Sequence, residues 1–206
     1  ILSGPSFSNE VSQSLPTVLT LATKDKKDFE NISKLIPNKE FRIYYSNDLI
    51  GTQIGGALKN IYAIAAGVAE GLNLGENAKS ALISRSFAEM TRYAKKFKAD
   101  KNTLFGLSGL GDLILTCSSK NSRNTQFGIK LASSKYDNFL DLLKSQEVTE
   151  GYYTVKAVYN ISQKKNIDMP IMKSVYNILY KQHDLKEELS NLPVSYTHLT
   201  LPTIPT

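Results

Sequence analysis

The first 45 residues combine two short apolar runs with one segment of helical spacing. Residues 16–22, PTVLTLA, are rich in β-branched and aliphatic side chains and predict a strand, as do residues 41–45, FRIYY. Between these runs, Phe29, Ile32 and Ile36 recur at helical intervals, which predicts a helix over residues 24–36. Strand, helix and strand make one βαβ crossover, which is too small to stand alone. Residues 1–45 are therefore expected to be the last portion of a larger sheet.

After this portion the apolar positions follow helical spacing. Two long stripes consist of Ile50, Ile54, Leu58, Tyr62, Ala65 and Ala69, and of Ile83, Phe87, Met90, Ala94 and Phe97. Further helices are predicted after the capping residue Asp100, after Gly151, from Pro170 and after the capping residue Asp184. Residues 46–192 are therefore expected to form an all-α domain, which makes the fold class mostly α.

The two ends of the chain differ from the rest. Residues 193–206 are rich in Thr and Pro, and they carry no acidic or basic residue except His198. This tail resembles a translated adapter sequence, and no function is expected of it. The chain opens with Ile1 and shows no signal peptide, which favours the loss of a preceding part.

Composition excludes several classes of function. Hydrophobic content is 41% and charged content 21%, which is typical of a soluble globular protein. No apolar run reaches the roughly 18 residues of a membrane span, so an integral membrane protein is not expected. One cysteine, Cys117, and two distant histidines argue against a metal site and fit a cytoplasmic location. The net charge of +6 comes from lysine clusters that do not alternate with aromatic residues, so we expect an anionic small molecule and no nucleic acid as partner.

Lys59 is the first candidate for chemistry, because it lies in the small, apolar stretch GGALKNIYAIAAG. It borders the apolar stripe, so its stem could lie on the helix with the ammonium group in water. Alternatively, it is partly desolvated and suited to proton transfer. Gly55 and Gly56 likewise indicate close helix packing, close approach of a ligand, or both. This stretch alone does not decide between these alternatives.

Three other stretches hold candidate site residues. In GLSGLGDL, Asp112 is either a helix cap or a carboxylate that orients Lys59 or a substrate hydroxyl. Ser122, Arg123 and Asn124 precede a helical run and favour an anion site, although Ser122 could simply cap that helix. The segment LSGPSF bends at Gly4 and Pro5, and its amide groups and Ser6 hydroxyl could face a ligand.

Together these motifs resemble the bacterial NAD(P)-dependent glycerol-3-phosphate dehydrogenases. The segments LSGPSF, PTVLTLA, GGALKNIYAIAAG, RSFAEMTRYA, GLSGLGDLILTC, SRN and EVTEG occur in the order of that family, from Leu2 to about Leu192. The resemblance implies an all-α C-terminal dehydrogenase domain preceded by the last βαβ portion of a Rossmann-type domain. It also implies NADPH- or NADH-dependent reduction of dihydroxyacetone phosphate to sn-glycerol 3-phosphate for phospholipid synthesis.

The family's residue roles can be carried over to this chain one by one. Lys59 matches the general acid and base. The resemblance gives substrate contacts to Gly4, Ser6, Lys59, Asp112, Ser122, Arg123 and Asn124, and cofactor contacts to Ser8, Arg123, Val148 and Glu150. Thr149 departs mildly from the family's usual VVEG. The family's glycine-rich nucleotide loop and a substrate-site lysine have no counterpart in these 206 residues, so we expect this polypeptide alone to be inactive.

Two other classes of function stay open. A related hydroxyacid or sugar-nucleotide dehydrogenase would share the architecture and the helical-domain lysine. A non-catalytic helical module is the other alternative. In that case unpaired apolar strand edges around residues 18–22 would favour self-association, and a homodimer is one option.

Overall fold

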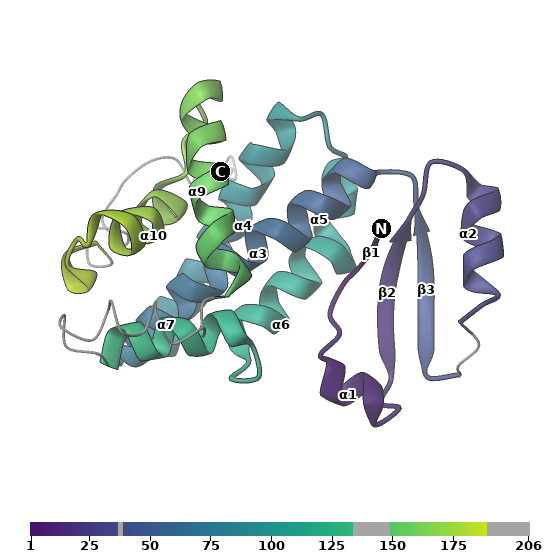
Figure 1. Ribbon diagram of the computed structural model, residues 1–206, viewed down its shortest axis with the longest axis horizontal. Helices are drawn as coiled ribbons and strands as arrows, with labels where there is room; N and C mark the ends of the chain where they lie inside the picture. Colours follow the sequence, from purple (N-terminus) through teal and green to yellow (C-terminus); the bar gives the residue numbers. More distant parts are fainter. Residues whose placement is uncertain (37–38, 134–148, 189–206) are drawn as a thin grey trace, which may run out of the picture.

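The computed structural model describes residues 1–36, 39–133 and 149–188. A small sheet lies at one end of the molecule, and helices make up the rest (Figure 1). The expectation for residues 193–206 lies outside the described part. The strands are β1 (Leu2–Ser3), β2 (Thr17–Ala22) and β3 (Phe41–Ser46). The helices are α1 (Ser8–Ser12), α2 (Lys26–Ser33), α3 (Leu49–Gly71), α4 (Gly75–Lys96), α5 (Lys101–Phe105), α6 (Asp112–Ser118), α7 (Arg123–Ser133), α9 (Glu150–Lys165) and α10 (Pro170–Lys181).

The sheet confirms both predicted strands and adds one. β2 and β3 are parallel, with Leu19 opposite Ile43, and α2 joins them beside β3. β1 runs antiparallel on the other side of β2, and its two residues were too few to give a periodic signal. β2 is thus the middle strand, with Leu19 and Leu21 each 4% exposed. The prediction that residues 18–22 expose unpaired apolar edges is therefore wrong.

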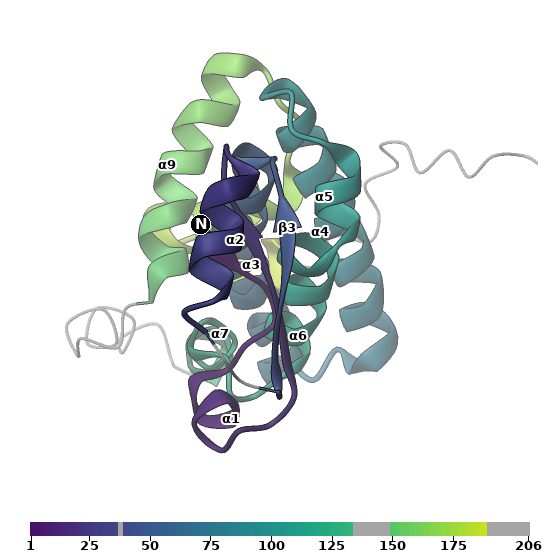
Figure 2. The same ribbon diagram turned by 90° about the vertical axis from the view of Figure 1, so that its right-hand side faces the viewer.

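Helix α3 is the centre of the helical region (Figures 1 and 2). It contacts α4, α6, α7, α9 and α10, and every residue from Ile61 to Ala66 is at most 1% exposed. The predicted stripe is confirmed from Ile54 onward. The assignment of Ile50 to this stripe is wrong, because Ile50 lies in the first turn of the helix and is 48% exposed. The small residues of this helix let its neighbours enclose the stretch from Asn60 to Ala69, which is buried throughout.

Helices α3 and α7 cross where two glycines face each other. A Cβ atom on Gly67 would collide with the Thr125 carbonyl oxygen, and one on Gly128 would lie 2.9 Å from Gly67 Cα. Any side chain at either position would therefore push the helices apart. Because α7 begins at Arg123, this close crossing sets the position of the predicted anion-binding residues.

Helix α4 buries its predicted stripe, with Met90 and Ala94 at most 1% exposed and Ile83, Phe87 and Phe97 packed against the core. Ile83 and Phe87 are only partly buried, whereas Glu89 is 1% exposed. The Glu89 carboxylate accepts hydrogen bonds from the backbone N–H groups of Ile171, at 2.6 Å, and Met172, at 3.2 Å. Burial of this residue is thus explained by its role at the start of α10.

Two predicted helix caps are confirmed by side-chain hydrogen bonds. Asp100 Oδ1 accepts from Asn102 N at 2.9 Å, and Asp184 Oδ1 accepts from Glu187 N at 2.9 Å. The helix expected over residues 24–36 is shorter, since α2 starts after its cap Asp25 and ends at Ser33. Across the described residues, no helix has both the length and the apolar character needed to cross a membrane.

Candidate active site

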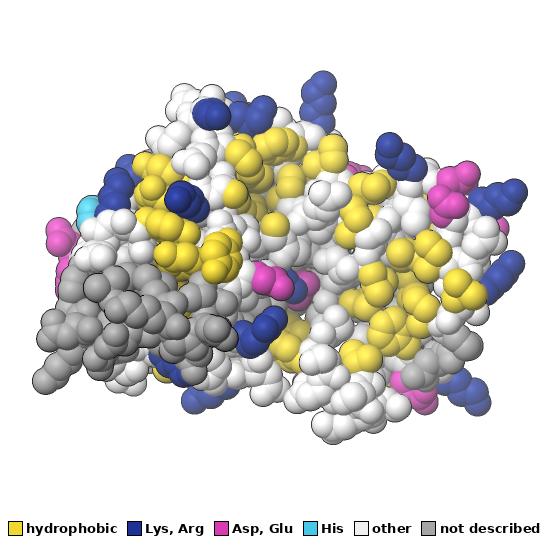
Figure 3. Space-filling view, viewed as in Figure 1, with side chains coloured by type: hydrophobic (Ala, Val, Ile, Leu, Met, Phe, Trp, Pro, Cys, Tyr) yellow, Lys and Arg dark blue, Asp and Glu magenta, His cyan; other side chains and the backbone are white. Residues whose placement is uncertain are grey.

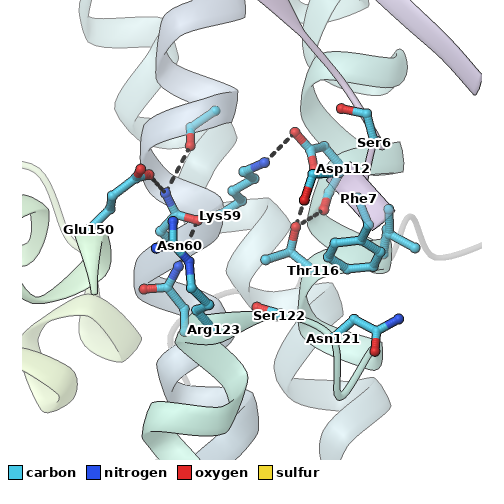
Figure 4. A pocket seen from close by; sticks show the side chains of 14 residues that line it. Ser6, Phe7, Lys59, Asn60, Asp112, Thr116, Asn121, Ser122, Arg123 and Glu150 are labelled. Carbon is cyan, nitrogen blue, oxygen red and sulfur yellow. Dashed lines mark hydrogen bonds and ion pairs between the residues drawn. The ribbon is translucent and has the colours of Figure 1, made fainter. Parts of the chain in front are cut away.

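A cavity of about 430 Å³ lies where the helical region meets the segment that follows β1. Side chains of both charges gather at the hollow between the two parts of the molecule (Figure 3). Helices α3, α6 and α7, the start of α9 and residues 6–8 supply its walls (Figure 4). Its size suits a small organic ligand. The lining residues are Ser6, Phe7, Ser8, Gly56, Lys59, Asn60, Asp112, Leu115, Thr116, Asn121, Ser122, Arg123, Asn124 and Glu150.

Lys59 and Asp112 form an ion pair inside this cavity. Lys59 Nζ donates to Asp112 Oδ2 at 2.6 Å, and the side chains are 22% and 3% exposed. Thr116 Oγ1 donates to the Asp112 carbonyl oxygen at 2.6 Å and lies 3.2 Å from Asp112 Oδ1. Lys59 is therefore neither free in water nor isolated, because a buried carboxylate holds its ammonium group at the cavity.

Asp112 is the first residue of α6, and the N-cap of that helix is Gly111. The Asp112 carboxylate bonds instead with Lys59 and Thr116, so the capping alternative is wrong. A π-helical turn, Leu107–Gly111, leads directly into α6 and continues its backbone. The Asp112 side chain is consequently available to Lys59.

Close packing is confirmed at Gly55, and Gly56 lines the cavity. A Cβ atom on Gly55 would collide with the Ser108 carbonyl oxygen in the π-helical turn, so Gly55 allows close packing. A Cβ atom on Gly56 would lie 3.2 Å from Ser3 Oγ. Together they bring the turn that carries Asp112 close to α3 while leaving room beside Lys59.

Asn60 joins three helices by side-chain hydrogen bonds. Its Nδ2 donates to Glu150 Oε2 at 3.1 Å, and its Oδ1 accepts from Asn124 Nδ2 at 3.0 Å. Asn124 Oδ1 accepts in turn from the backbone N–H of Gly151 at 3.0 Å. Asn60 was not predicted as a site residue, although an amide within an apolar helix indicates that a polar partner lies inside the fold.

The start of α7 provides the predicted anion-binding groups. Ser122 Oγ accepts from Thr125 N at 3.3 Å, so capping by Ser122 is confirmed. Arg123 is exposed at the cavity, and within residues 1–36, 39–133 and 149–188 its guanidinium group has no ion-pair partner. The helix N-terminus and this guanidinium group favour a negatively charged ligand.

Most predicted site residues come together at the cavity. Those that line it are Ser6, Ser8, Lys59, Asp112, Ser122, Arg123, Asn124 and Glu150. Gly4 does not line it. Gly4 is buried, has φ +141°, and a Cβ atom there would lie 3.0 Å from Leu19 Cδ2, so it shapes the backbone before Ser6. Val148 lies outside the described residues. The sequence analysis missed Asn60, and it also missed four residues that carry no pattern of their own: Phe7, Leu115, Thr116 and Asn121.

Cys117 lies near the ion pair but is not equipped for nucleophilic chemistry. The side chain is fully buried, and this burial raises the pKa of the Cys117 thiol to about 12. A thiol with so high a pKa stays protonated near neutral pH. The ionisable side chains of the described part that face the cavity are therefore Lys59, Asp112, Arg123 and Glu150.

Comparisons with known proteins show the family of this chain. The family model for the NAD-dependent glycerol-3-phosphate dehydrogenase C-terminus matches residues 48–190. Glycerol-3-phosphate dehydrogenase [NAD(P)+] of Solidesulfovibrio magneticus is 48% identical over 89% of this chain and 56% of its own length. The Colwellia psychrerythraea protein of the same name is 42% identical over 93% of this chain and 58% of its own.

A solved structure shows the same fold. The crystal structure of glycerol-3-phosphate dehydrogenase from Coxiella burnetii superposes with a TM-score of 0.88 at 37% identity. It covers 93% of this chain and 59% of the Coxiella chain. The chain thus spans little more than half the length of the relatives that it matches. The sequence matches and the shared fold establish that this chain belongs to the NAD(P)-dependent glycerol-3-phosphate dehydrogenase family.

Proposed function

We propose that this chain provides the substrate-binding half of an enzyme that reduces dihydroxyacetone phosphate to sn-glycerol 3-phosphate with NADPH or NADH. The observation that carries the proposal is the Lys59–Asp112 ion pair in a cavity that also holds Arg123. A proton donor and a phosphate-binding group then face the same small ligand. The product would enter glycerophospholipid synthesis in the cytoplasm.

The reaction needs one hydride and one proton for each ketone. When the cofactor is bound, its reduced nicotinamide supplies the hydride to the carbonyl carbon. Lys59 donates a proton to the carbonyl oxygen as that oxygen becomes an alkoxide, and its positive charge stabilises the developing charge. Asp112 orients the Lys59 ammonium group through the 2.6 Å hydrogen bond. Solvent returns the proton to Lys59, and the reverse reaction uses Lys59 as the base.

The remaining residues divide between substrate and cofactor. Ser122, Arg123 and Asn124 would form the phosphate-binding wall, with Ser6 also lining the cavity and Gly4 shaping the backbone before Ser6. Ser8, Arg123, Glu150 and Val148 would contact the cofactor. The donors present fit an anionic group, because Arg123 is exposed to the cavity at the helix N-terminus. Hydroxyl and carboxylate groups at Ser8 and Glu150 suit sugar hydroxyls.

We further propose that the chain comprises two functional parts. Residues 1–45 belong to a nucleotide-binding domain, and residues 46–192 form the substrate-binding domain. The given sequence has no Gly-x-Gly-x-x-Gly motif between a strand and a helix. We therefore expect no dehydrogenase activity from this polypeptide until a nucleotide-binding domain is supplied.

The test joins this chain, ended at Leu192, to the first domain of a close relative. Absorbance follows NADPH oxidation in the presence of dihydroxyacetone phosphate. We expect turnover that falls by at least about 100-fold in Lys59→Met, the size of a general acid's contribution. Lys120→Met is the matched control, because Lys120 is 75% exposed and does not line the cavity. Circular dichroism checks that each variant is folded.

The outcomes separate this reaction from its nearest alternative. Near-normal turnover in Lys59→Met would contradict the role of Lys59. Turnover with glycerol 3-phosphate but not with glycerol would support a phosphorylated substrate. No turnover in a folded joined protein would overturn the proposed substrate and favour a hydroxyacid or sugar-nucleotide dehydrogenase of the same architecture.

A further inference from the structure

The site contains a closed ring of hydrogen bonds. The donor of the first bond is a backbone N–H group, and it fixes which group donates in each of the other bonds. Gly151 N–H donates to Asn124 Oδ1, Asn124 Nδ2 donates to Asn60 Oδ1, and Asn60 Nδ2 donates to Glu150 Oε2. Glu150 and Gly151 are neighbours in the chain, which closes the ring. The ring links α3, α7 and α9 beside Lys59 (Figure 4).

A backbone N–H group can only donate, and this decides how both amides are turned. If Asn124 were flipped, its Nδ2 group would face the Gly151 N–H group and two donors would meet. Asn124 must therefore direct its Nδ2 group toward Asn60. Asn60 must then accept with Oδ1 and direct Nδ2 toward the cavity. Asn60 and Asn124 are 6% and 7% exposed, so water cannot readily replace these bonds.

The approach of α9 to α3 depends on glycine at position 151. A Cβ atom there would lie 2.6 Å from the Asn60 carbonyl oxygen and 2.7 Å from both Asn124 Oδ1 and Ile64 Cδ1. Any other residue would push the start of α9 outward and lengthen the bond to Asn124. The close backbone contact at Gly151 is thus needed to keep its N–H group within hydrogen-bond distance of Asn124, and so to fix the orientation of both amides.

We propose that Asn124 is a positioning residue that acts through Asn60. The Gly151 N–H group turns Asn124, and Asn124 turns Asn60, so that α3 presents a hydrogen-bond donor to the cavity next to Lys59. In this arrangement the acceptor is the Glu150 carboxylate. A ligand oxygen would take its place, which selects ligands that carry acceptors at this wall. We call this chain of bonds from Gly151 through Asn124 to Asn60 the relay. The relay is argued from the hydrogen bonds alone, and only its use for a phosphorylated substrate rests on the proposed function.

Nuclear magnetic resonance tests the relay in the unaltered chain. Couplings across hydrogen bonds should connect Gly151 N with Asn124 Cγ, and Asn124 Nδ2 with Asn60 Cγ. A coupling from Asn60 Nδ2 to Asn124 Cγ would show the opposite direction and overturn the proposal. The measurement needs no substrate, so its failure would leave the proposed reaction untouched.

A set of variants tests whether the ring can be reversed. In Asn124→Asp, the new carboxylate still accepts from Gly151 N–H but can no longer donate to Asn60. Asn60 should turn to donate to it, which leaves two acceptors facing each other at Glu150. We expect the folding equilibrium constant to fall about ten-fold, the usual effect of one lost buried hydrogen bond.

Adding Glu150→Gln should restore most of that loss, because the Gln amide can donate to the turned Asn60. Adding Glu150→Ala instead removes the carboxylate that faces the Asn60 acceptor but supplies no donor. This change should restore little of the lost stability. Asn121→Asp is the matched control, since it adds one charge to the cavity wall outside the ring. Equal effects of Gln and Ala at position 150 would overturn the relay, as would additive effects of Asn124→Asp and Glu150→Gln.

Discussion

Asp112 is buried more deeply than the lysine that neutralises it. Lys59 Nζ lies 2.6 Å from Asp112 Oδ2, yet the carboxylate side chain is 3% exposed and that of Lys59 is 22% exposed. The ammonium group is thus accessible from the cavity, while its partner is enclosed by α6 and α3. This asymmetry suits a residue that must reach a ligand while its charge is held in place.

Lys59→Met should therefore weaken the fold as well as abolish the proposed activity. The change leaves Asp112 buried without a cation, which we expect to lower the free energy of unfolding by about 3 kcal/mol. Urea unfolding measures this loss. Adding Asp112→Asn to Lys59→Met should recover most of the stability, because the buried charge is then gone. Lys101→Met, at an exposed position over the Phe105 ring, is the control. Full stability of Lys59→Met alone would contradict the structural role of the pair.

Glu89 should make stability depend on pH. Burial raises the pKa of the Glu89 carboxyl from 4.5 to about 7, although the N–H groups of Ile171 and Met172 act in the opposite direction. A raised pKa in the folded state favours the protonated form. The resulting stabilisation is complete below about pH 4.5 and is lost as the pH rises through about 7. It amounts to about 3 kcal/mol.

Glu89→Gln isolates this effect, because the amide does not titrate. As the pH rises from 4.5 to 7, the free energy of unfolding of the unaltered chain should fall relative to that of Glu89→Gln. Glu76→Gln, on the exposed side of the first turn of the same helix, should show no such trend. A constant difference for Glu89→Gln would mean that the carboxyl titrates normally.

Gly128→Ala should separate α7 from α3. The added methyl group would lie 2.8 Å from Val68 N and 2.9 Å from Gly67 Cα, and these backbone atoms cannot move aside independently. We expect a loss of about 2 kcal/mol in thermal unfolding experiments. Gly111→Ala is the control, since a Cβ atom there would lie 3.7 Å from the Gly106 carbonyl oxygen and 4.0 Å from Pro5 Cγ, which are ordinary contact distances. If both variants are equally stable, the glycine crossing does not control the distance between these helices.

Asp48 should stabilise two helix starts at once. Its Oδ1 accepts from Gly51 N at 2.8 Å at the start of α3, and its Oδ2 accepts from Asp100 N at 2.8 Å just before α5. Asp48→Asn keeps one acceptor and should cost about 1 kcal/mol, whereas Asp48→Ala loses both and should cost about 2 kcal/mol. Hydrogen exchange of the Gly51 and Asp100 amides reports each bond separately. Asp28→Asn, at an exposed site in α2, is the control.

Local sequence patterns determined most of the strands and helices, whereas Ser8 and Glu150 were assigned to the site only by the family resemblance. β2 and β3, the caps at Asp100 and Asp184, and the α3 stripe from Ile54 onward follow from spacing between near neighbours in the chain. Such patterns depend on the period of the backbone, so they can be recognised before any tertiary contact is known.

Only the tertiary structure decided which side chains meet. Lys59 and Asp112 are 53 residues apart, and Asn60 and Glu150 are 90 apart. Their encounter depends on the glycine contacts that bring α7 and the π-helical turn against α3. The inward position of Glu89 depends likewise on α10, which begins at Pro170. Contacts of this kind arise from the packing of whole helices, so no pattern of near neighbours along the chain encodes them.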